Sequence, residues 1–273
     1  FGIEFRGGSE FRVSGVASTS QQIAIDAVHS VNPDAAPLVS NVGTDAIRVQ
    51  TEQLEDTESE AVRVALAKAY KVESGAVASS FIGANRGADV TQKALTGLIV
   101  FVILAAILMA LYFRTLKMSA AAMIALAHDL VITAGVYGAL GFEVTPAAVI
   151  GFLTILGYSL YDTVVVFDKI RENTFEVEFS ETATFAERVN LAINQTLVRS
   201  INTSIVAVLP VAAILFIGGT LLGAGTLRDI SLALFVGIIV GTYSTIFIAA
   251  PAYSHLREGE AKYKKAAAKA LAN

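Results

Sequence analysis

Residues 94–113 read ALTGLIVFVILAAILMALYF, twenty residues without a charged side chain, between Lys93 and Arg114. A helix that crosses the hydrocarbon layer of a membrane needs about 20 mostly apolar residues. Further apolar runs of spanning length lie at residues 118–142, 145–167, 200–222 and 230–253. The sequence therefore predicts an all-α membrane bundle of five spanning helices, confined to residues 94–253.

The overall composition supports a membrane protein and excludes several other classes. Hydrophobic residues make up 54% of the chain and charged residues only 16%, with a mean hydropathy of +0.62. Soluble domains carry about 25% charged residues. The net charge of −4 leaves no basic surplus to neutralise phosphates, which excludes nucleic acid as a general partner. The chain has no cysteine, so disulfides and thiolate metal sites are excluded, and we expect neither a metal nor a cofactor.

Residues 1–92 differ from the rest, because their apolar residues follow short strand and helix patterns. They predict a small α+β domain with strands at 3–6, 10–13, 45–51 and 77–82, and helices at 20–31 and 57–70. The first two strands would join around Gly7 and Gly8. Thr57 and Glu60 have the spacing of a capping box at the start of the second helix.

Residues 93–256 form the predicted helical membrane domain, and residues 257–273 a basic tail. Between the third and fourth apolar runs, residues 184–196 carry Phe185 and Val189 on one stripe, with charged and amide side chains opposite. This pattern predicts an amphipathic helix that lies on the membrane surface.

The charged loops predict the orientation of the bundle. Eleven Lys and Arg residues lie in the loops at 114–117 and 168–199 and in the tail after Tyr253, whereas the alternate loops hold one. The positive-inside rule places the basic loops, the amphipathic helix and the C-terminus in the cytoplasm, and the N-terminal domain outside the cell. An exported domain needs a preceding apolar segment, so we expect a sixth span before Phe1 in the full chain.

Asp162 is the one acid in the third apolar run and lies six residues before the charged end of that run at Asp168. An acid at this depth is a functional candidate by default, and Ser159 and Thr163 add polarity on the same helix. The alternative is an acid near the interface that reaches water and has no role.

Arg199 begins the next run and is four residues before Thr203, so the two share a helix face. A cation there could pair with Asp162 and lower the cost of both charges. The alternative is an interfacial anchor that extends to the lipid headgroups.

His128 and Asp129 interrupt the second apolar run. A His–Asp pair inside a membrane could relay protons. The run could also begin at Leu130, which would leave both residues at the interface.

Three further residues predict features of helix packing. Gly237 and Gly241 are four residues apart, which allows two helices to approach closely. Pro210 lies in the middle of the fourth run, where it should bend the helix and could act as a hinge.

Three sequence blocks together resemble the SecF family of bacterial preprotein translocase subunits, part of the SecD/SecF family in the resistance–nodulation–division superfamily. The blocks are GIEFRGG at residues 2–8, DTVVVFDKIREN at 162–173 and RSINTS at 199–204. The resemblance implies a multi-pass protein of the bacterial cytoplasmic membrane that works with a SecD-like subunit, a SecYEG-type channel, membrane lipid and an unfolded preprotein. It also implies that the proton gradient drives export, with Asp162, Arg199 and Thr203 on the proton path.

Two other functions remain open at this stage. The chain could be a proton-driven transporter of lipid or another hydrophobic small molecule, or a scaffold in which Asp162 does not need to titrate. Because the sequence contains no hydrolase, metalloprotease or phosphate-loop motif, we do not expect an enzyme.

Overall fold

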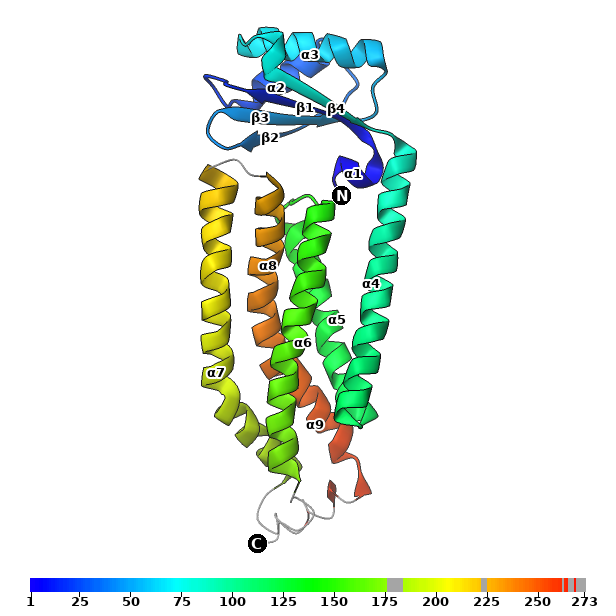
Figure 1. Cartoon of the computed structure of the whole chain (residues 1–273), viewed down its shortest axis with the longest axis vertical. Helices are drawn as coiled ribbons and strands as arrows, with labels where there is room; N and C mark the ends of the chain where they lie inside the picture. The colour runs from blue at the N-terminus through cyan, green and yellow to red at the C-terminus, as the bar shows by residue number, and fades with distance from the viewer. Residues whose placement is uncertain (176–183, 222–224, 262, 265–267, 269–273) are drawn as a thin grey trace. The chain divides into compact units, whose positions relative to one another are not determined.

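The computed structural model describes residues 1–175, 184–221, 225–261, 263–264 and 268, and its helices and strands are drawn in Figure 1. The chain divides into two compact units. Unit 1 comprises Phe1–Gly97, Glu143–Ile150 and Ala212–Leu232, and unit 2 comprises Leu98–Phe142, Gly151–Val211 and Ala233–Asn273. Each unit therefore draws on several separate parts of the sequence.

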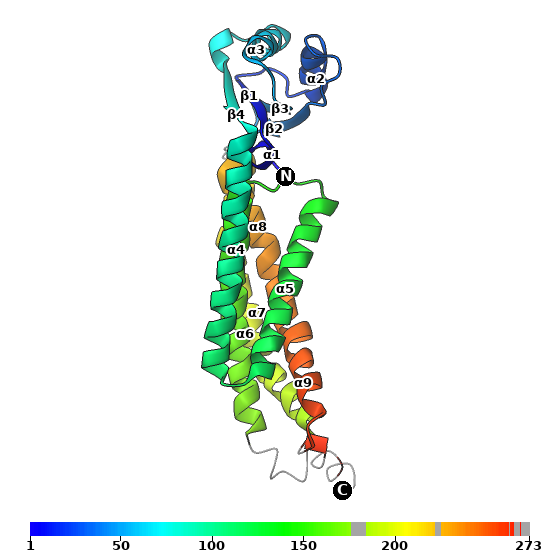
Figure 2. The ribbon, with the colours of Figure 1, turned by 90° about the vertical axis from the view of Figure 1, so that its right-hand side faces the viewer.

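Unit 1 contains a four-stranded antiparallel sheet in the order β2-β3-β1-β4. Its elements are α1 (Ile3–Arg6), β1 (Gly8–Ser14), α2 (Gln21–His29), β2 (Leu38–Val42), β3 (Ala46–Thr51), α3 (Asp56–Tyr70), η1 (Ser74–Ala76) and β4 (Val77–Ile82). The central strand β1 pairs Phe11 with Val49 of β3 and with Ser79 of β4. Helices α2 and α3 cover one face of the sheet (Figure 2), and Phe11, Val13 and Val62 are fully buried in the core between them.

The small α+β domain is confirmed, with both predicted helices and the strands at 10–13, 45–51 and 77–82. The predicted strand at 3–6 is wrong. These residues form α1, a single helical turn in which the Gly7 amide donates to the Ile3 carbonyl at 2.7 Å. Gly7 and Gly8 both have positive φ, 79° and 149°, so the chain turns there from α1 into β1 rather than between two strands.

Two further details differ from the sequence prediction. The capping box of α3 is formed by Glu55 and Glu58 rather than by Thr57 and Glu60, so the helix begins one residue earlier. Strand β2 was not predicted, because LVSNV has no clear alternation of apolar and polar residues. Its place in the sheet depends on pairing with β3, which local pattern does not reveal.

Among the described residues, five helices are long and apolar enough to cross a membrane, which confirms the predicted number. They are α4 (Ala84–Phe113), α5 (Leu116–Ala139), α6 (Pro146–Thr174), α7 (Phe185–Ala213) with the π-helical η2 (Ile214–Leu221), and the continuous series α8 (Gly225–Ser244), η3 (Thr245–Ala249) and α9 (Ala250–Glu258). Pro210 lies inside α7, four residues before η2 begins. Its role as a hinge stays a prediction.

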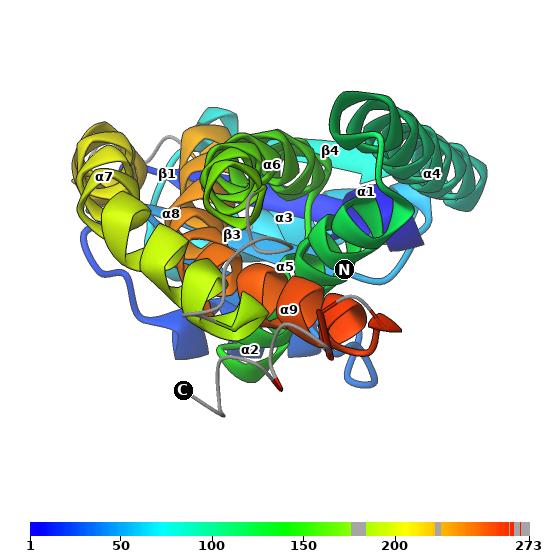
Figure 3. The ribbon, with the colours of Figure 1, turned by 90° about the horizontal axis from the view of Figure 1, so that it is seen from below.

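The predicted amphipathic helix at 184–196 is not a separate element. It is the first part of α7, because no helix-breaking residue separates it from the fourth apolar run. Its stripe of Phe185, Val189 and Ala192 is buried in the core of unit 2, in one cluster with Ala250 and Tyr253. In Figure 3 this part of α7 runs beside α9.

Candidate functional site

Asp162 lies on α6 in the interior of unit 2, where it is 9% exposed. Its Oδ1 accepts a hydrogen bond of 2.9 Å from the Ser200 hydroxyl on α7. Its Oδ2 is buried beside Thr245 of η3 and accepts no hydrogen bond from the part of the chain that the structure describes. The acid is therefore enclosed by helices.

Arg199 and Thr203 lie on the same face of α7, as predicted, but this face turns away from Asp162. The Arg199 side chain is exposed, and no ion pair within 4.0 Å joins it to Asp162 among the described side chains. The Thr203 hydroxyl donates to the Arg199 carbonyl at 2.8 Å. Successive residues of a helix are rotated by about 100°, so Ser200 contacts the acid while Arg199 does not.

Asp129 is more deeply buried than Asp162, with 2% exposure in α5. Its Oδ2 accepts a hydrogen bond of 2.5 Å from the Ser159 hydroxyl of α6. His128 Nδ1 lies 3.4 Å from the other oxygen, and the His128 side chain is 25% exposed. Helix α5 begins at Leu116, so it continues through both residues and encloses Asp129 in the bundle.

Hydroxyl groups surround both acids and connect four helical elements. The Thr163 and Thr245 hydroxyls lie 3.1 Å apart, and Ser204 and Thr242 form a second hydroxyl pair between α7 and α8. We call the following buried or half-buried side chains the polar layer: Asp129, Ser159, Asp162, Thr163, Ser200, Ser204, Thr242, Ser244 and Thr245.

The two predicted packing glycines allow α8 to approach α6 closely. A Cβ at Gly237 would overlap the side chain of Ile155. A Cβ at Gly241 would lie 3.2 Å from the Ser159 hydroxyl and 3.6 Å from Asp129 Oδ2. Gly241 therefore lies against the polar layer, whereas Gly237 packs only against an apolar side chain.

Sequence reasoning missed the hydroxyl partners of the acids, above all Ser200. Ser200 and Ser204 are four residues apart and so share one face of α7. This spacing is the sequence signal that could have indicated a polar face directed into the bundle. The layer offers two acids with hydroxyl donors, and within the described ranges the one basic group in contact with them is the partly exposed imidazole of His128. Such carboxyl groups are suited to binding and releasing protons, because an ionised acid without a cation is costly inside a membrane.

Unit 1 holds a second polar cluster, where residues 143–145 precede α6. Arg48 of β3 forms an ion pair of 2.9 Å with Glu143, and the Gly2 amide donates to the Val144 carbonyl at 2.9 Å. The Thr145 hydroxyl donates to Asp229 of α8 at 2.8 Å. These contacts fix the start of α6, the helix of Asp162, to the sheet and to α8.

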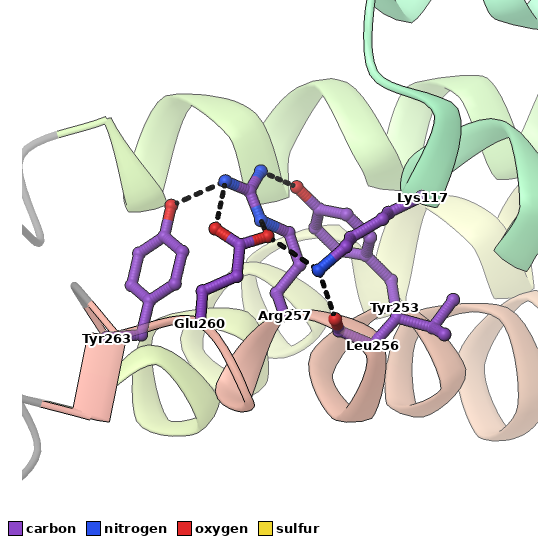
Figure 4. A network of polar contacts seen from close by, with 6 residues as sticks. All are labelled: Lys117, Tyr253, Leu256, Arg257, Glu260 and Tyr263. Carbon is purple, nitrogen blue, oxygen red and sulfur yellow. Dashed lines mark hydrogen bonds and ion pairs between the residues drawn. The ribbon is translucent and has the colours of Figure 1, made fainter.

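A third cluster in unit 2 joins the end of α9 to the start of α5 (Figure 4). Arg257 donates to the hydroxyls of Tyr253 at 2.8 Å and Tyr263 at 2.9 Å. Glu260 accepts hydrogen bonds from Arg257 and, at 2.8 Å, from Lys117. Burial opposes ionisation of Glu260, but the bonds from Lys117 and Arg257 outweigh it and hold the pKa of this carboxyl below its ordinary value. This cluster is an anchor for the segment after α9.

Known proteins resemble the chain over most of its length. A family model described as "Protein export membrane protein SecD/SecF, C-terminal" matches residues 62–259. The SecF translocase subunit of Streptomyces coelicolor is 44% identical over 99% of this chain and 72% of the relative. That of Mycobacterium tuberculosis is 41% identical over 94% of this chain, which spans 60% of the relative.

The fold also matches solved structures. The crystal structure of SecDF from Thermus thermophilus superimposes with a TM-score of 0.79 at 31% identity, covering 94% of this chain and 34% of that one. A SecDF structure in a super-membrane-facing form gives a TM-score of 0.63 at 30% identity, covering all of this chain and 36% of that one. The chain therefore belongs to the SecD/SecF family of protein export membrane proteins, as a multi-pass membrane protein.

Proposed function

We propose that this chain is the SecF-type subunit of a bacterial preprotein translocase, and that it couples proton movement through the polar layer to protein export. The observation that carries the proposal is the buried Asp162 carboxyl, which accepts from one hydroxyl of α7 and has no ion pair with any described side chain. The relatives named as SecF translocase subunits support the role in export. A role as an enzyme is not part of the proposal.

The SecDF protein of Thermus thermophilus supports a SecD-like partner, because its name joins both subunits and this chain covers only 34% of it. A SecYEG-type channel, an unfolded preprotein and membrane lipid complete the proposed set of partners. The charged loops support an arrangement with the sheet domain outside the cytoplasmic membrane and the C-terminus inside.

The proposed cycle starts from the two protonation states of Asp162. An ionised carboxylate accepts hydrogen bonds with both oxygens, whereas a protonated one also donates. A change of state therefore alters the bond to Ser200 and the packing of α6 against α7. Each proton that crosses the membrane supplies about 2.3 kcal/mol per 100 mV, enough to shift a two-state packing equilibrium roughly fifty-fold. Arg199, on the outer face of α7, would reach Asp162 only in another packing state.

The proposal is tested with the full-length protein and its partner subunit in membrane vesicles under an imposed proton gradient. Asp162→Asn should abolish the part of preprotein translocation that depends on the gradient, while insertion and partner binding persist. The matched control is Asp168→Asn on the same helix, where an exposed acid accepts from Tyr112 at 2.6 Å. Normal gradient-driven translocation by the Asp162 variant would overturn the proposal.

A second candidate, transport of lipid, is favoured by one observation. A groove of about 510 Å³ runs between α7 and α8 and is lined almost entirely by apolar side chains, among them Ile205, Leu209, Ile239 and Phe247. Vesicles that carry a fluorescent phospholipid distinguish the two functions. Gradient-driven lipid movement without any effect on preprotein translocation would favour the transporter.

A further inference from the structure

Among the described residues, the most enclosed acid is not Asp162 but Asp129, which contacts two other helices, α6 and α8. Ser159 of α6 donates to it, Ser244 of α8 lies beside it, and Gly241 of α8 closes the remaining side. His128, whose side chain is 25% exposed, gives it a connection toward the surface of the bundle. A carboxyl group in such a place is costly to retain unless it has a function.

Ser159 differs from Thr196 and Ser231, two other buried hydroxyl residues of the spanning helices. Thr196 and Ser231 donate to carbonyl oxygens of their own helices, three or four residues earlier, which is the usual way to satisfy a hydroxyl inside a membrane. Ser159 instead donates across the helix interface to Asp129. Ser159 and Asp162 are three residues apart on α6 and therefore neighbours on one face.

We propose that Asp129 is a second proton-carrying carboxyl group, connected to Asp162 through the Ser159 hydroxyl. The inference rests on the proposed function and adds a residue to its proton path. It predicts that the pathway has two carboxyl stations on adjacent helices, α5 and α6, rather than one.

The transfer step conserves atoms and charge. The Ser159 hydroxyl, which donates to Asp129 in this structure, first rotates toward Asp162. Protonated Asp129 then gives its proton to Ser159 Oγ, and the proton that Ser159 already holds passes to ionised Asp162. Asp129 ends ionised, Asp162 ends protonated, and Ser159 is unchanged. His128, in contact with Asp129 and partly exposed, is the group that would reload Asp129 with a proton.

The alternative is that Asp129 only holds α5 and α6 together through its hydrogen bond. Asparagine distinguishes the two roles, because its side-chain carbonyl still accepts from Ser159 while it carries no titratable proton. In vesicles with the full-length complex, Asp129→Asn should lower gradient-driven translocation about tenfold or more while assembly persists. A purely structural Asp129 would leave translocation near normal.

Ser159→Ala provides the second variant, with Ser231→Ala as its matched control. Both remove a buried hydroxyl from a spanning helix, but only Ser159 contacts an acid. Ser159→Ala should impair translocation and Ser231→Ala should not. If Asp129→Asn does not assemble, the comparison of Ser159→Ala with Ser231→Ala tests the relay instead. Equal effects of these two variants on translocation would overturn the relay.

Infrared difference spectroscopy of the carboxyl groups gives a readout that packing alone does not change. In the unmodified complex, a change in proton gradient should produce two carboxyl difference bands, one from Asp129 and one from Asp162. Each of the variants Asp129→Asn and Asp162→Asn should show only the band of the remaining acid. Loss of translocation in Asp162→Asn with normal translocation and an unchanged spectrum in Asp129→Asn would overturn the relay and leave the proposed function intact. Normal translocation in both variants would overturn the proposed function itself.

Discussion

Arg48 of β3 and Glu143, three residues before α6, form an ion pair with 2.9 Å between Nη2 and Oε2. Both side chains are largely buried, with 24% and 16% exposure. The pair connects the sheet domain directly to the segment that begins the helix of Asp162. Because α6 continues along the chain to Asp162, the pair offers a covalent route between the domain proposed to lie outside the cell and the proposed proton site.

Reversing this pair tests the route. Arg48→Glu or Glu143→Arg alone should cost about 1–3 kcal/mol of unfolding free energy and reduce translocation, because each leaves two like charges in contact. The double variant, in which the two residues are exchanged, should recover most of the lost unfolding free energy and most of the lost translocation. The control is the Glu60–Arg63 pair on the outer surface of α3, at 2.6 Å, whose reversal should change both the unfolding free energy and translocation less than the single reversals at Arg48 or Glu143. Failure of the double exchange to restore translocation would argue against the route.

Arg199 and Asp162 provide a test of contacts in another state of the bundle. If Arg199 pairs with Asp162 during the cycle, Arg199→Lys should impair export, because Lys lacks the planar fork, and Arg199→Met should impair it more. The double variant with Asp162→Asn should be little worse than either single variant. Arg171→Lys, an exposed arginine of α6, is the control. Additive losses in the cycle would show that the two residues act separately.

Gly237 should be intolerant of any side chain. Gly237→Ala places a methyl group against Ile155 and should cost about 1–3 kcal/mol, measured as a lower midpoint of thermal unfolding in detergent. Gly157→Ala on α6, which has open space around the added methyl group, should be neutral or slightly stabilising. Equal effects of the two variants would contradict the close packing of α8 on α6.

The anchor around Glu260 should weaken in acid. The folded-state pKa of Glu260 is depressed, so its contribution is present above the pKa of the unfolded chain and is lost as pH falls through the folded value. Hydrogen exchange of the amides of residues 258–261, 263 and 264 should therefore rise, after correction for the intrinsic rate, as the pH falls through this range. Glu260→Gln should remove the pH dependence, with a loss below about 1 kcal/mol at neutral pH. Unchanged pH dependence in this variant would exclude Glu260 as the titrating group.

The proposed orientation is tested with reporters on the full-length protein. A fusion after Asn273 should be active only in the cytoplasm, and one inserted at residues 43–45, in the turn between β2 and β3, only outside it. The opposite pattern would overturn the argument from loop charge.

The amino-acid sequence by itself determined the number of spanning helices and the presence of a separate α+β domain. Both follow from local requirements, since a span needs about 20 apolar residues and short strands and helices have distinct periods. The sequence also identified Asp162, because a lone acid in an apolar run is conspicuous wherever the helix packs. The helical turn at 3–6 was mistaken for a strand because four residues are too few to show a period.

Only the tertiary structure decided which groups meet the two acids. Inside a membrane the surfaces of a helix that face lipid and protein are both apolar, so hydropathy does not show which face of α7 turns inward. Arg199 and Ser200 are adjacent in sequence, yet only Ser200 contacts Asp162. The burial of Asp129 depends on where α6 and α8 pack, and the close approach at Gly241 is a property of the assembled bundle. The polar layer is therefore set by helix rotation and packing, which no single stretch of sequence encodes.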